Sequence, residues 1–416
     1  MMKLRVLIFL CAALILAACV TATNGRAAGA NAATTSAAAS NGAASRGAAI
    51  AISGPYAKAP ALGIHLGTLL HGQYDAITDV AGVTVGQVTH IEGSGKLVPG
   101  VGPVRTGVTG IIPRADIWHH RVFAAVWPLN GNGEMTGSLW VNESGFLETP
   151  IVLTDSLSVG RVDDGVVSWM IEHNPKIGYI EDVPLPVVAE VNDDFLNDQP
   201  GRHNLPKDAV TALDSATGGP VAQGDVGAGT GAVAYEFHGG IGTASRVVPK
   251  NEGGYTVGVL VNANTFERRQ DLTVEGVPVG ANIMDLRPVE HSSDGSIIIV
   301  VATDAPFSPL QLIDLCKHAA LGLARTGGSS REGSGDIIIA FSTANVVPYD
   351  SDRATFTPTE MDRAYINPVF VAAIESTDEA VVNSLLASTT MVGRDGNKIY
   401  ALPHDRLMQL LHRYGR

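Results

Sequence analysis

The most informative stretch of the chain for its fold is Asp294-Gly295-Ser296-Ile297-Ile298-Ile299-Val300-Val301-Ala302. A polar segment ends at Gly295, and a continuous apolar run, mostly β-branched, begins directly after Ser296. Such a run predicts a strand that is buried on both faces, because it leaves no position for solvent. Ser296 would then begin a buried strand that holds its hydroxyl rigidly. Gly295 permits backbone geometry that other residues cannot adopt.

Similar short apolar runs predict strands elsewhere, and capping signals predict helices late in the chain. Ser308 and Pro309 suit the first positions of a helix. Ser376 and Glu379 have capping-box spacing before a helix over Ala380–Ala387. We expect a helix over Pro358–Glu375 to be interrupted by Pro368, and Pro403 to open a last helix. The predicted strands are Val83–Val85, Phe123–Trp127, Pro186–Val191, Thr256–Val261, Ile297–Ala302 and Asp336–Ser342.

This distribution of elements predicts an α+β fold, a sandwich of sheets with flanking helices, better than a Rossmann repeat. The chain has 416 residues, 45% of them hydrophobic and 17% charged, so it can bury a large core. Its 47 glycines suit sheets joined by tight turns. The formal net charge of −13 argues against nucleic acid as a partner, since phosphate binding needs a basic face.

The N-terminus is typical of an export signal. Lys3 and Arg5 precede the apolar stretch Val6–Ala18, which is short for a membrane span and ends in small residues. Leu16-Ala17-Ala18-Cys19 matches a bacterial lipobox, so residues 1–18 would be removed and Cys19 lipidated; the alternative is an ordinary signal peptide cut nearby. This predicts a periplasmic protein or, since Val20 follows the cysteine, an outer-membrane lipoprotein.

After the signal, the composition predicts a flexible tether over residues 19–52, rich in alanine, glycine and serine. We expect the ordered domain to follow over residues 53–416. Cys316 has no partner left for an intrachain disulfide.

Most common catalytic signatures are missing from the sequence. It contains no H-E-x-x-H, no paired C-x-x-C and no G-x-S-x-G. The glycine-rich run Gly224–Gly231 lacks the Lys-Ser/Thr ending of a P-loop, and a tight backbone wall near a pocket fits it better than a nucleotide site. His119, His120 and His404 fit surface or interface positions better than metal ligation. We therefore predict neither a metal nor an organic cofactor.

Several ordered blocks give the sequence a specific resemblance. From about Asp75 to the last helix it resembles the L-aminopeptidase/D-amidase-esterase and beta-peptidyl aminopeptidase family of self-processing, N-terminal-nucleophile-type serine hydrolases. That resemblance implies a catalytic domain with two central sheets between helical layers, an αββα-type sandwich. It also implies a precursor that cuts itself into an N-terminal fragment, 53–295, and a C-terminal fragment, 296–416, which stay together. The matching blocks are Ala76–Val80, Pro150–Asp155, Gly227–Gly231, Gly239–Arg246, Asp294–Ile298, Thr303–Pro306, Gly333–Asp336 and Thr389–Gly393.

The resemblance also assigns roles to individual residues. Cleavage between Gly295 and Ser296 would give Ser296 both a nucleophilic hydroxyl and a free α-amine. The pKa of such an amine is about 8, so part of it is available as a base at neutral pH. Asn264 would donate its amide to the oxyanion, and Ser334 and Asp336 would orient Ser296. A strand-end turn for Asn264 and a purely structural role for Asp336 remain open; some relatives carry glutamate in place of this aspartate.

Substrate recognition is likewise implied by the resemblance. Glu190 would pair with the substrate ammonium, with a solvated strand-end charge as the alternative. Relatives can carry an aromatic residue where this chain has Asn192, which leaves the pocket shape open. Trp127 and Trp140 would line the pocket or belong to the core. The expected substrates are short peptides, amides or esters, β-amino or D-configured residues among them, and the expected assembly is a homo-oligomer of cleaved heterodimers.

Two other functions are compatible with the sequence. Relatives of the same general fold transfer acyl groups to amines, although they use a threonine nucleophile where this chain has serine. A surface lipoprotein that keeps the fold without catalysis is the second alternative. It predicts a protein that stays one chain and hydrolyses no amino-acyl anilide.

Overall fold

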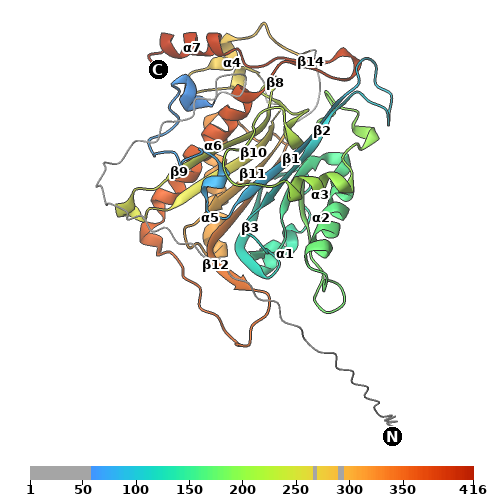
Figure 1. Ribbon diagram of the computed structural model, residues 1–416. Coiled ribbons are helices and arrows are strands. Elements are labelled where there is room, and N and C mark those ends of the chain that lie inside the picture. The colour runs from blue at the N-terminus through green and yellow to red at the C-terminus, as the bar shows by residue number, and fades with distance from the viewer. Residues whose placement is uncertain (1–57, 266–268, 289–294) are drawn as a thin grey trace, which may run out of the picture. The chain divides into compact units, whose positions relative to one another are not determined.

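Two β-sheets lie face to face between two layers of helices in the computed structural model, which describes residues 58–265, 269–288 and 295–416 (Figure 1). The predicted signal, the tether and Cys19 lie outside the described residues. The larger sheet has the order β4 (Phe146–Leu147), β3 (His120–Gly131), β12 (Gly335–Pro348), β11 (Ser296–Thr303), β10 (Thr256–Asn264) and β9 (Gly240–Val247). The smaller has the order β1 (Thr84–Glu92), β2 (Val104–Ile112), β5 (Ile151–Asp155) and β6 (Val187–Val191).

Neighbouring strands are antiparallel except for β11–β12 and β5–β6, which are parallel. Two short ribbons, β7 (Val233–Ala234) with β8 (Phe237–His238) and β13 (Met391–Val392) with β14 (Lys398–Ile399), complete the strands of the described ranges. The α-helices are α1 (Ser138–Ser144), α2 (Val159–His173), α3 (Pro206–Asp214), α4 (Val279–Asn282), α5 (Pro309–Arg325), α6 (Asn367–Ala387) and α7 (His404–Arg413).

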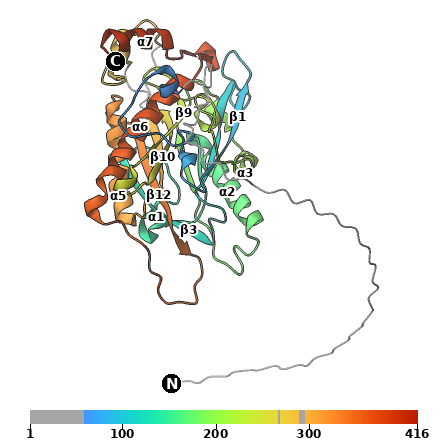
Figure 2. The same ribbon diagram turned by 60° about the vertical axis from the view of Figure 1, so that its left-hand side comes forward.

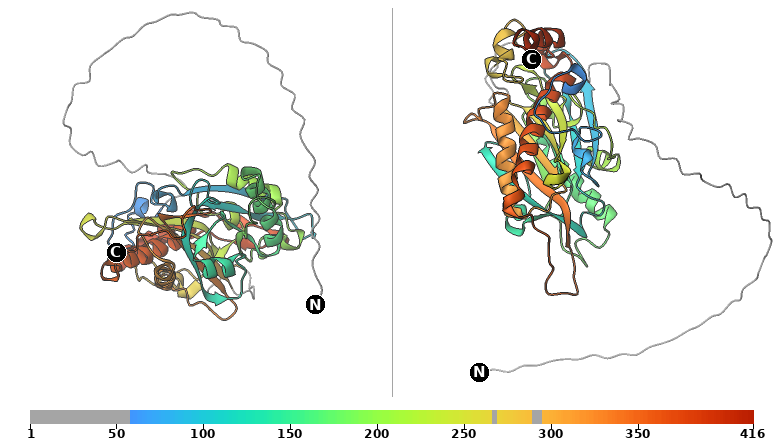
Figure 3. Two further views of the ribbon diagram at one scale, coloured as in Figure 1. Left: turned by 90° about the horizontal axis from the view of Figure 1, so that it is seen from below. Right: turned by 90° about the vertical axis from the view of Figure 1, so that its left-hand side faces the viewer.

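Strand β11 shows how the apolar stretch builds two cores at once. Successive side chains of a strand point to opposite faces of its sheet. Ile297 and Ile299 pack with α5 and α6, whereas Ile298 and Val300 pack against the four-stranded sheet. A third core lies between that smaller sheet and α2 and α3. Figures 2 and 3 show α5 and α6 on one side of the strands and α2 and α3 on the other. The predicted α+β sandwich is confirmed.

All six predicted strands are present, with ends that differ by a few residues and with longer extensions at β1, β3 and β12. Helix α5 begins as predicted: Pro309 is its first residue, and the Gln311 side chain accepts a hydrogen bond from the Ser308 backbone nitrogen at 3.1 Å. Pro403 directly precedes α7, also as predicted.

The prediction for the helices between Pro358 and Ala387 is wrong. Helix α6 is continuous, Pro368 occupies its first turn rather than interrupting it, and Ser376 and Glu379 lie in its buried interior instead of capping a new start. A proline is tolerated in a first turn because the nitrogen there has no partner within the helix. The Ser376–Glu379 spacing imitated a capping box, but Glu379 is used in a tertiary contact.

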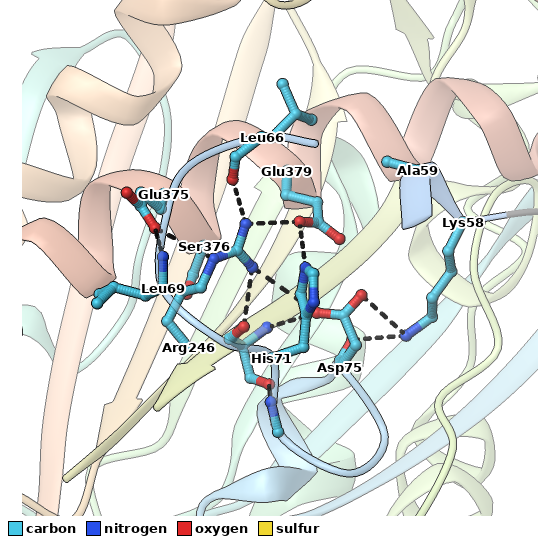
Figure 4. A network of polar contacts seen from close by, with 12 residues as sticks. Lys58, Ala59, Leu66, Leu69, His71, Asp75, Arg246, Glu375, Ser376 and Glu379 are labelled. Carbon is cyan, nitrogen blue, oxygen red and sulfur yellow. Dashed lines mark hydrogen bonds and ion pairs between the residues drawn. The ribbon is translucent and has the colours of Figure 1, made fainter. Parts of the chain in front are cut away.

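That contact belongs to a buried network that ties the first described residues of the chain to α6 (Figure 4). Arg246 on β9 is 1% exposed, and it donates to Glu379 Oε2 at 2.6 Å and to Glu375 Oε2 at 3.3 Å. His71 Nε2 lies 3.0 Å from Glu379 Oε2. Glu375 also accepts the backbone nitrogens of Thr68 and Leu69 at 2.8 and 3.0 Å. The network therefore joins segments on both sides of the Gly295–Ser296 bond.

No helix within the described part of the chain combines the length and the apolar character that crossing a membrane requires.

Candidate active site

Ser296 is the first residue of β11 and lies between the end of β10 and the start of β12. Its register partners are Asn264 on the antiparallel side and Gly335 on the parallel side. Ser296 is 6% exposed. Because side chains alternate along a strand, its hydroxyl shares the face of Ile298, which packs against the four-stranded sheet. The predicted nucleophile is thus at the edge of the space between the two sheets.

Gly295 is held where only glycine fits. A Cβ atom built on it would lie 1.8 Å from the backbone carbon and oxygen of Thr265, a distance that no side chain can occupy. Its carbonyl oxygen accepts a hydrogen bond from the Gly335 backbone nitrogen at 3.4 Å. The bond predicted to be cut is therefore fixed on both sides by neighbouring backbone, and its carbonyl already faces a donor.

Asn264 lies directly beside Ser296 across the β10–β11 pair, where Cβ atoms are typically about 4.5–5.5 Å apart. Its Oδ1 accepts from the Val233 nitrogen at 2.7 Å, and its Nδ2 donates to the Asn192 carbonyl at 2.7 Å. These two bonds fix the orientation of the amide. A side-chain amide has two hydrogens on its nitrogen, so a second one is available for an oxyanion formed next to Ser296.

Ser334 and Asp336 enclose Gly335 at the start of β12. Ser334 Oγ donates to Asp336 Oδ1 at 2.6 Å, and both residues are buried. Asp336 is the register partner of Ile297, one position beyond Ser296. The structure thus brings this pair next to the predicted nucleophile in the sheet and couples the two side chains to each other.

Glu190 reaches the same site from the four-stranded sheet. Its Oε1 accepts the Glu134 backbone nitrogen at 3.0 Å, and its Oε2 accepts the Ser156 hydroxyl. A Cβ built on Gly133 would lie 3.2 Å from Glu190 Oε1 and 3.3 Å from the Gly335 Cα. The carboxylate is therefore separated from the register partner of Ser296 by little more than this glycine.

The electrostatics of Glu190 follow from its burial. Burial raises the pKa of its carboxyl above the usual value, while the hydrogen bonds from Ser156 and from the Glu134 nitrogen lower it. The nearby carboxylates of Asp155 and Glu134 raise it further. Burial also raises the pKa of Asp155. Burial, together with the nearby charge of Asp155, raises the pKa of Asp193 well above its usual value. This concentration of acidic groups favours a cationic ligand over an anionic one.

Asn192 takes part through its backbone rather than its side chain. Its carbonyl receives the Asn264 amide, whereas its Oδ1 accepts from the Asp194 nitrogen at 3.0 Å and from Gln199 Nε2 at 2.9 Å. The two tryptophans contact other parts of the protein. Trp127 packs on the helix-covered face of the six-stranded sheet, and Trp140 donates to Glu148 Oε1 at 3.2 Å.

Sequence reasoning missed the residues that hold the site in place. Ser156, Gly133 and Val233 carry no catalytic signature, and their roles arise only from contacts with Glu190, Gly335 and Asn264. A partial signal existed for Ser156, because it directly follows the matching block Pro150–Asp155.

The glycine-rich run supports this site by close packing. A Cβ on Gly229 would lie 2.3 Å from the Ile241 nitrogen, and one on Gly231 would lie 2.2 Å from the Arg105 carbonyl oxygen. The Gly227 nitrogen donates to Thr89 Oγ1 at 2.8 Å. The run is therefore a tight backbone wall, as the sequence predicted, and it leads to Val233, which orients Asn264.

One group of possible metal ligands occurs within the described residues, namely His71, Asp75 and Glu379, whose ligand atoms lie within 4.8 Å of one another. Arg246 already donates to Glu379 Oε2, and Lys58 Nζ lies 3.9 Å from Asp75 Oδ2. Cationic side chains thus neutralise these carboxylates, and the cluster reads as an ion-pair network. His119 and His120 lie beside Asp116 at the surface, and His404 Nε2 lies 2.9 Å from the Leu386 carbonyl.

Comparisons with known proteins agree with this geometry. Residues 75–399 match the model of peptidase family S58. A beta-peptidyl aminopeptidase of Sphingosinicella microcystinivorans is 43% identical over 359 residues, which cover 83% of this chain and 89% of the relative.

Solved structures agree as well. The beta-aminopeptidase of a Burkholderia species superposes with a TM-score of 0.80 at 41% identity, covering 86% of this chain and 99% of the other. The L-aminopeptidase D-Ala-esterase/amidase of Ochrobactrum anthropi, a variant of the Ntn hydrolase fold, gives a TM-score of 0.80 at 40% identity over the same shares. These relatives favour peptide hydrolysis over acyl transfer or a non-catalytic surface role. This chain is an aminopeptidase with the Ntn hydrolase type of fold, and it belongs to peptidase family S58.

Proposed function

We propose that the protein cuts its own Gly295–Ser296 bond and then uses Ser296 to release N-terminal residues from short peptides, amides or esters. The observation that supports this most is the position of Ser296, which is buried at the start of β11 between Asn264 and Gly335. A nucleophile, a side-chain amide donor and a donor to the Gly295 carbonyl converge there.

The self-cleavage follows from these contacts. The Ser296 hydroxyl attacks the Gly295 carbonyl carbon, and the oxyanion forms where the Gly335 nitrogen already donates to the carbonyl oxygen and where Asn264, the register partner of Ser296, offers its side-chain amide. The hydroxyl proton passes to the Ser296 nitrogen, the carbon–nitrogen bond breaks, and Gly295 is left as an ester on the Ser296 oxygen. Water hydrolyses that ester, which leaves Ser296 with a free hydroxyl and a free α-amine.

The same residue then performs aminopeptidase chemistry. The unprotonated α-amine accepts the hydroxyl proton as the oxygen attacks the substrate carbonyl, and it returns the proton to the leaving amine. Asn264 donates its second amide hydrogen to the oxyanion, and water releases the acyl group in a second step. Ser334 and Asp336 orient the new N-terminus of Ser296.

Substrate selection rests on Glu190. Its carboxylate pairs with the free ammonium of the substrate, which distinguishes a chain terminus from an internal amide. Recognition that depends mainly on this ammonium tolerates changes at the adjoining carbon, so β-amino and D-configured residues are included among the substrates. The Asn192 side chain is held within its own loop by hydrogen bonds from the Asp194 nitrogen and Gln199 Nε2.

The test is the state of the chain in the purified protein. A denaturing gel is expected to show two fragments, and Edman sequencing of the smaller one to begin Ser-Ile-Ile-Ile at Ser296. Ser296→Ala should stay one chain without hydrolytic activity, while Ser296→Cys retains a nucleophile and should still be cut. An active wild-type protein with an intact bond between Gly295 and Ser296 would refute the proposal.

We also infer export and lipidation at Cys19 from the apolar stretch and lipobox of the N-terminus, which gives a periplasmic or outer-membrane location. Mass spectrometry of the mature N-terminus tests this. Assembly of the cleaved heterodimers into a homo-oligomer is tested by light scattering after size-exclusion chromatography.

A further inference from the structure

We propose that Ser156 is a positioning residue for substrate recognition: its hydroxyl holds the Glu190 carboxylate in the orientation that receives the substrate ammonium. This inference rests on the proposed function, and it assigns a role to the segment that follows the block Pro150–Asp155. Ser156 itself contacts the carboxylate, not the reacting atoms.

The parallel pairing of β5 and β6 places the two side chains together. Thr154 is the register partner of Glu190, and Asp155 is the partner of Val191. The chain turns into a short 3₁₀ helix, Ser156–Ser158, directly after β5, and the Ser156 hydroxyl donates to Glu190 Oε2. Parallel strands that end at the same level thus deliver the donor and the acceptor to one point.

The two oxygens of Glu190 are held by different elements. Ser156 bonds Oε2, and the Glu134 nitrogen, from the loop after β3, bonds Oε1 at 3.0 Å. An ionised carboxylate offers about four lone-pair positions, so two donors leave acceptor capacity for an ammonium. With both oxygens held, the plane of the carboxylate is fixed, and the directions of its remaining lone pairs are fixed as well.

Ser156 is itself held by a buried cap. Asp155 Oδ1 accepts the backbone nitrogens of Leu157 and Ser158, each at 3.1 Å, which fixes the 3₁₀ turn that carries Ser156. Asp155 Oδ2 accepts Asn204 Nδ2 at 2.8 Å, so the aspartate cannot rotate freely. Hydrogen bonds from Asn204 to Asp155, and from the turn that carries Ser156 to Asp155, therefore connect the buried residues beside β5 to the Glu190 carboxylate.

The charges around Glu190 make the hydroxyl important. Burial raises the pKa of Glu190, and the carboxylates of Asp155 and Glu134 raise it further. The Ser156 hydroxyl and the Glu134 nitrogen act in the opposite direction. Without the hydroxyl, Glu190 would take up a proton at a higher pH and would then no longer attract a cation.

The test compares Ser156→Ala with the wild-type protein on an amino-acyl p-nitroanilide and on the analogous anilide that lacks the amino group. We expect KM for the amine-bearing substrate to rise by about tenfold, which corresponds to the loss of one hydrogen bond to a charged group. The kcat value should stay within a few-fold, the acid limb of kcat/KM should move to higher pH, and self-cleavage should be normal. The ratio of kcat/KM for the amine-bearing anilide to that for the amine-free anilide should fall.

Ser168→Ala is the matched control, since its hydroxyl donates to the Asp164 carbonyl on α2 and does not contact Glu190. If Ser156→Ala fails to self-cleave, Ser156→Thr and Ser156→Val give the same comparison, because threonine and valine have nearly the same size and differ in the hydroxyl. The threonine variant is expected to keep the wild-type KM. Unchanged KM and pH profile in the variant without a hydroxyl would overturn this inference. A wild-type protein that neither cuts itself nor hydrolyses the anilide would instead overturn the proposed function.

Discussion

Replacement of Asn264 by alanine should reduce the rate of both reactions at Ser296. Removal of one oxyanion donor typically lowers a rate by about 10²–10³-fold, and the orientation of this amide is fixed by bonds of 2.7 Å to Val233 and Asn192. The same change leaves the Val233 nitrogen and the Asn192 carbonyl without their partner. A buried polar group left unsatisfied costs about 1–3 kcal/mol, so we expect a stability loss of about 2–6 kcal/mol.

Asn262 provides a control that separates the two effects. It lies two residues earlier on the same face of β10, pairs with Ile298 instead of Ser296, and donates Nδ2 to the Ala228 carbonyl at 3.2 Å. Asn262→Ala should therefore lose stability while its rates remain within a few-fold of wild type.

The assay follows self-cleavage on a denaturing gel over time, kcat/KM for an amino-acyl p-nitroanilide in the cleaved protein, and thermal unfolding of both variants. If self-cleavage of Asn264→Ala is too slow to yield enzyme, its rate on the gel is the readout. Rates for Asn264→Ala within tenfold of those for Asn262→Ala would refute the role of Asn264 as an oxyanion donor.

Two further predictions concern the buried ion-pair network. Arg246→Met should destabilise the fold by about 3–5 kcal/mol, because it leaves the carboxylates of Glu375 and Glu379 buried without the guanidinium. Denaturant unfolding in a Ser296→Ala background measures this loss of stability. A loss below about 1 kcal/mol would contradict the prediction. Although burial opposes the shift, the hydrogen bond with His71 and the charge of Arg246 lower the pKa of Glu379 to about 2, so its stabilisation is present above its unfolded pKa of 4.5 and is lost as the pH falls from there towards 2. The hydrogen bond to Glu379 raises the pKa of His71, so the stability that protonated His71 contributes is complete below pH 6.5 and is lost as the pH rises through the raised pKa. Thermal unfolding from pH 3 to 9 should show that Glu379→Gln flattens the acid side of the stability profile. An unchanged profile would exclude the network as the cause of the acid dependence.

How far the sequence could predict this site depends on the range of the interactions involved. The place of Ser296 at the start of a buried strand was predictable because its signal is local: a glycine precedes it and an apolar run follows it. Its predicted role as the nucleophile came from the resemblance to a known family. The resemblance to a known family supplied Asn264 and Glu190, but their register and their hydrogen bonds could not be read from spacing. The predicted interruption at Pro368 was wrong because local rules allow a proline either to end a helix or to begin one, and the choice depends on distant contacts.

Three elements could be predicted from a few neighbouring residues each: the strand that follows Gly295, the start of α5 at Pro309, and the close-packed backbone of the glycine-rich run. Other contacts depend on how the folded elements pack: Ser156 donates to Glu190, and the Val233 nitrogen donates to Asn264. In the same way, Glu379 forms an ion pair with Arg246 instead of capping a helix. This difference arises because hydrophobic periodicity and capping act within a turn or two of the chain. Contacts between segments tens to hundreds of residues apart are set by the stacking and register of the two sheets, which many weak interactions fix together.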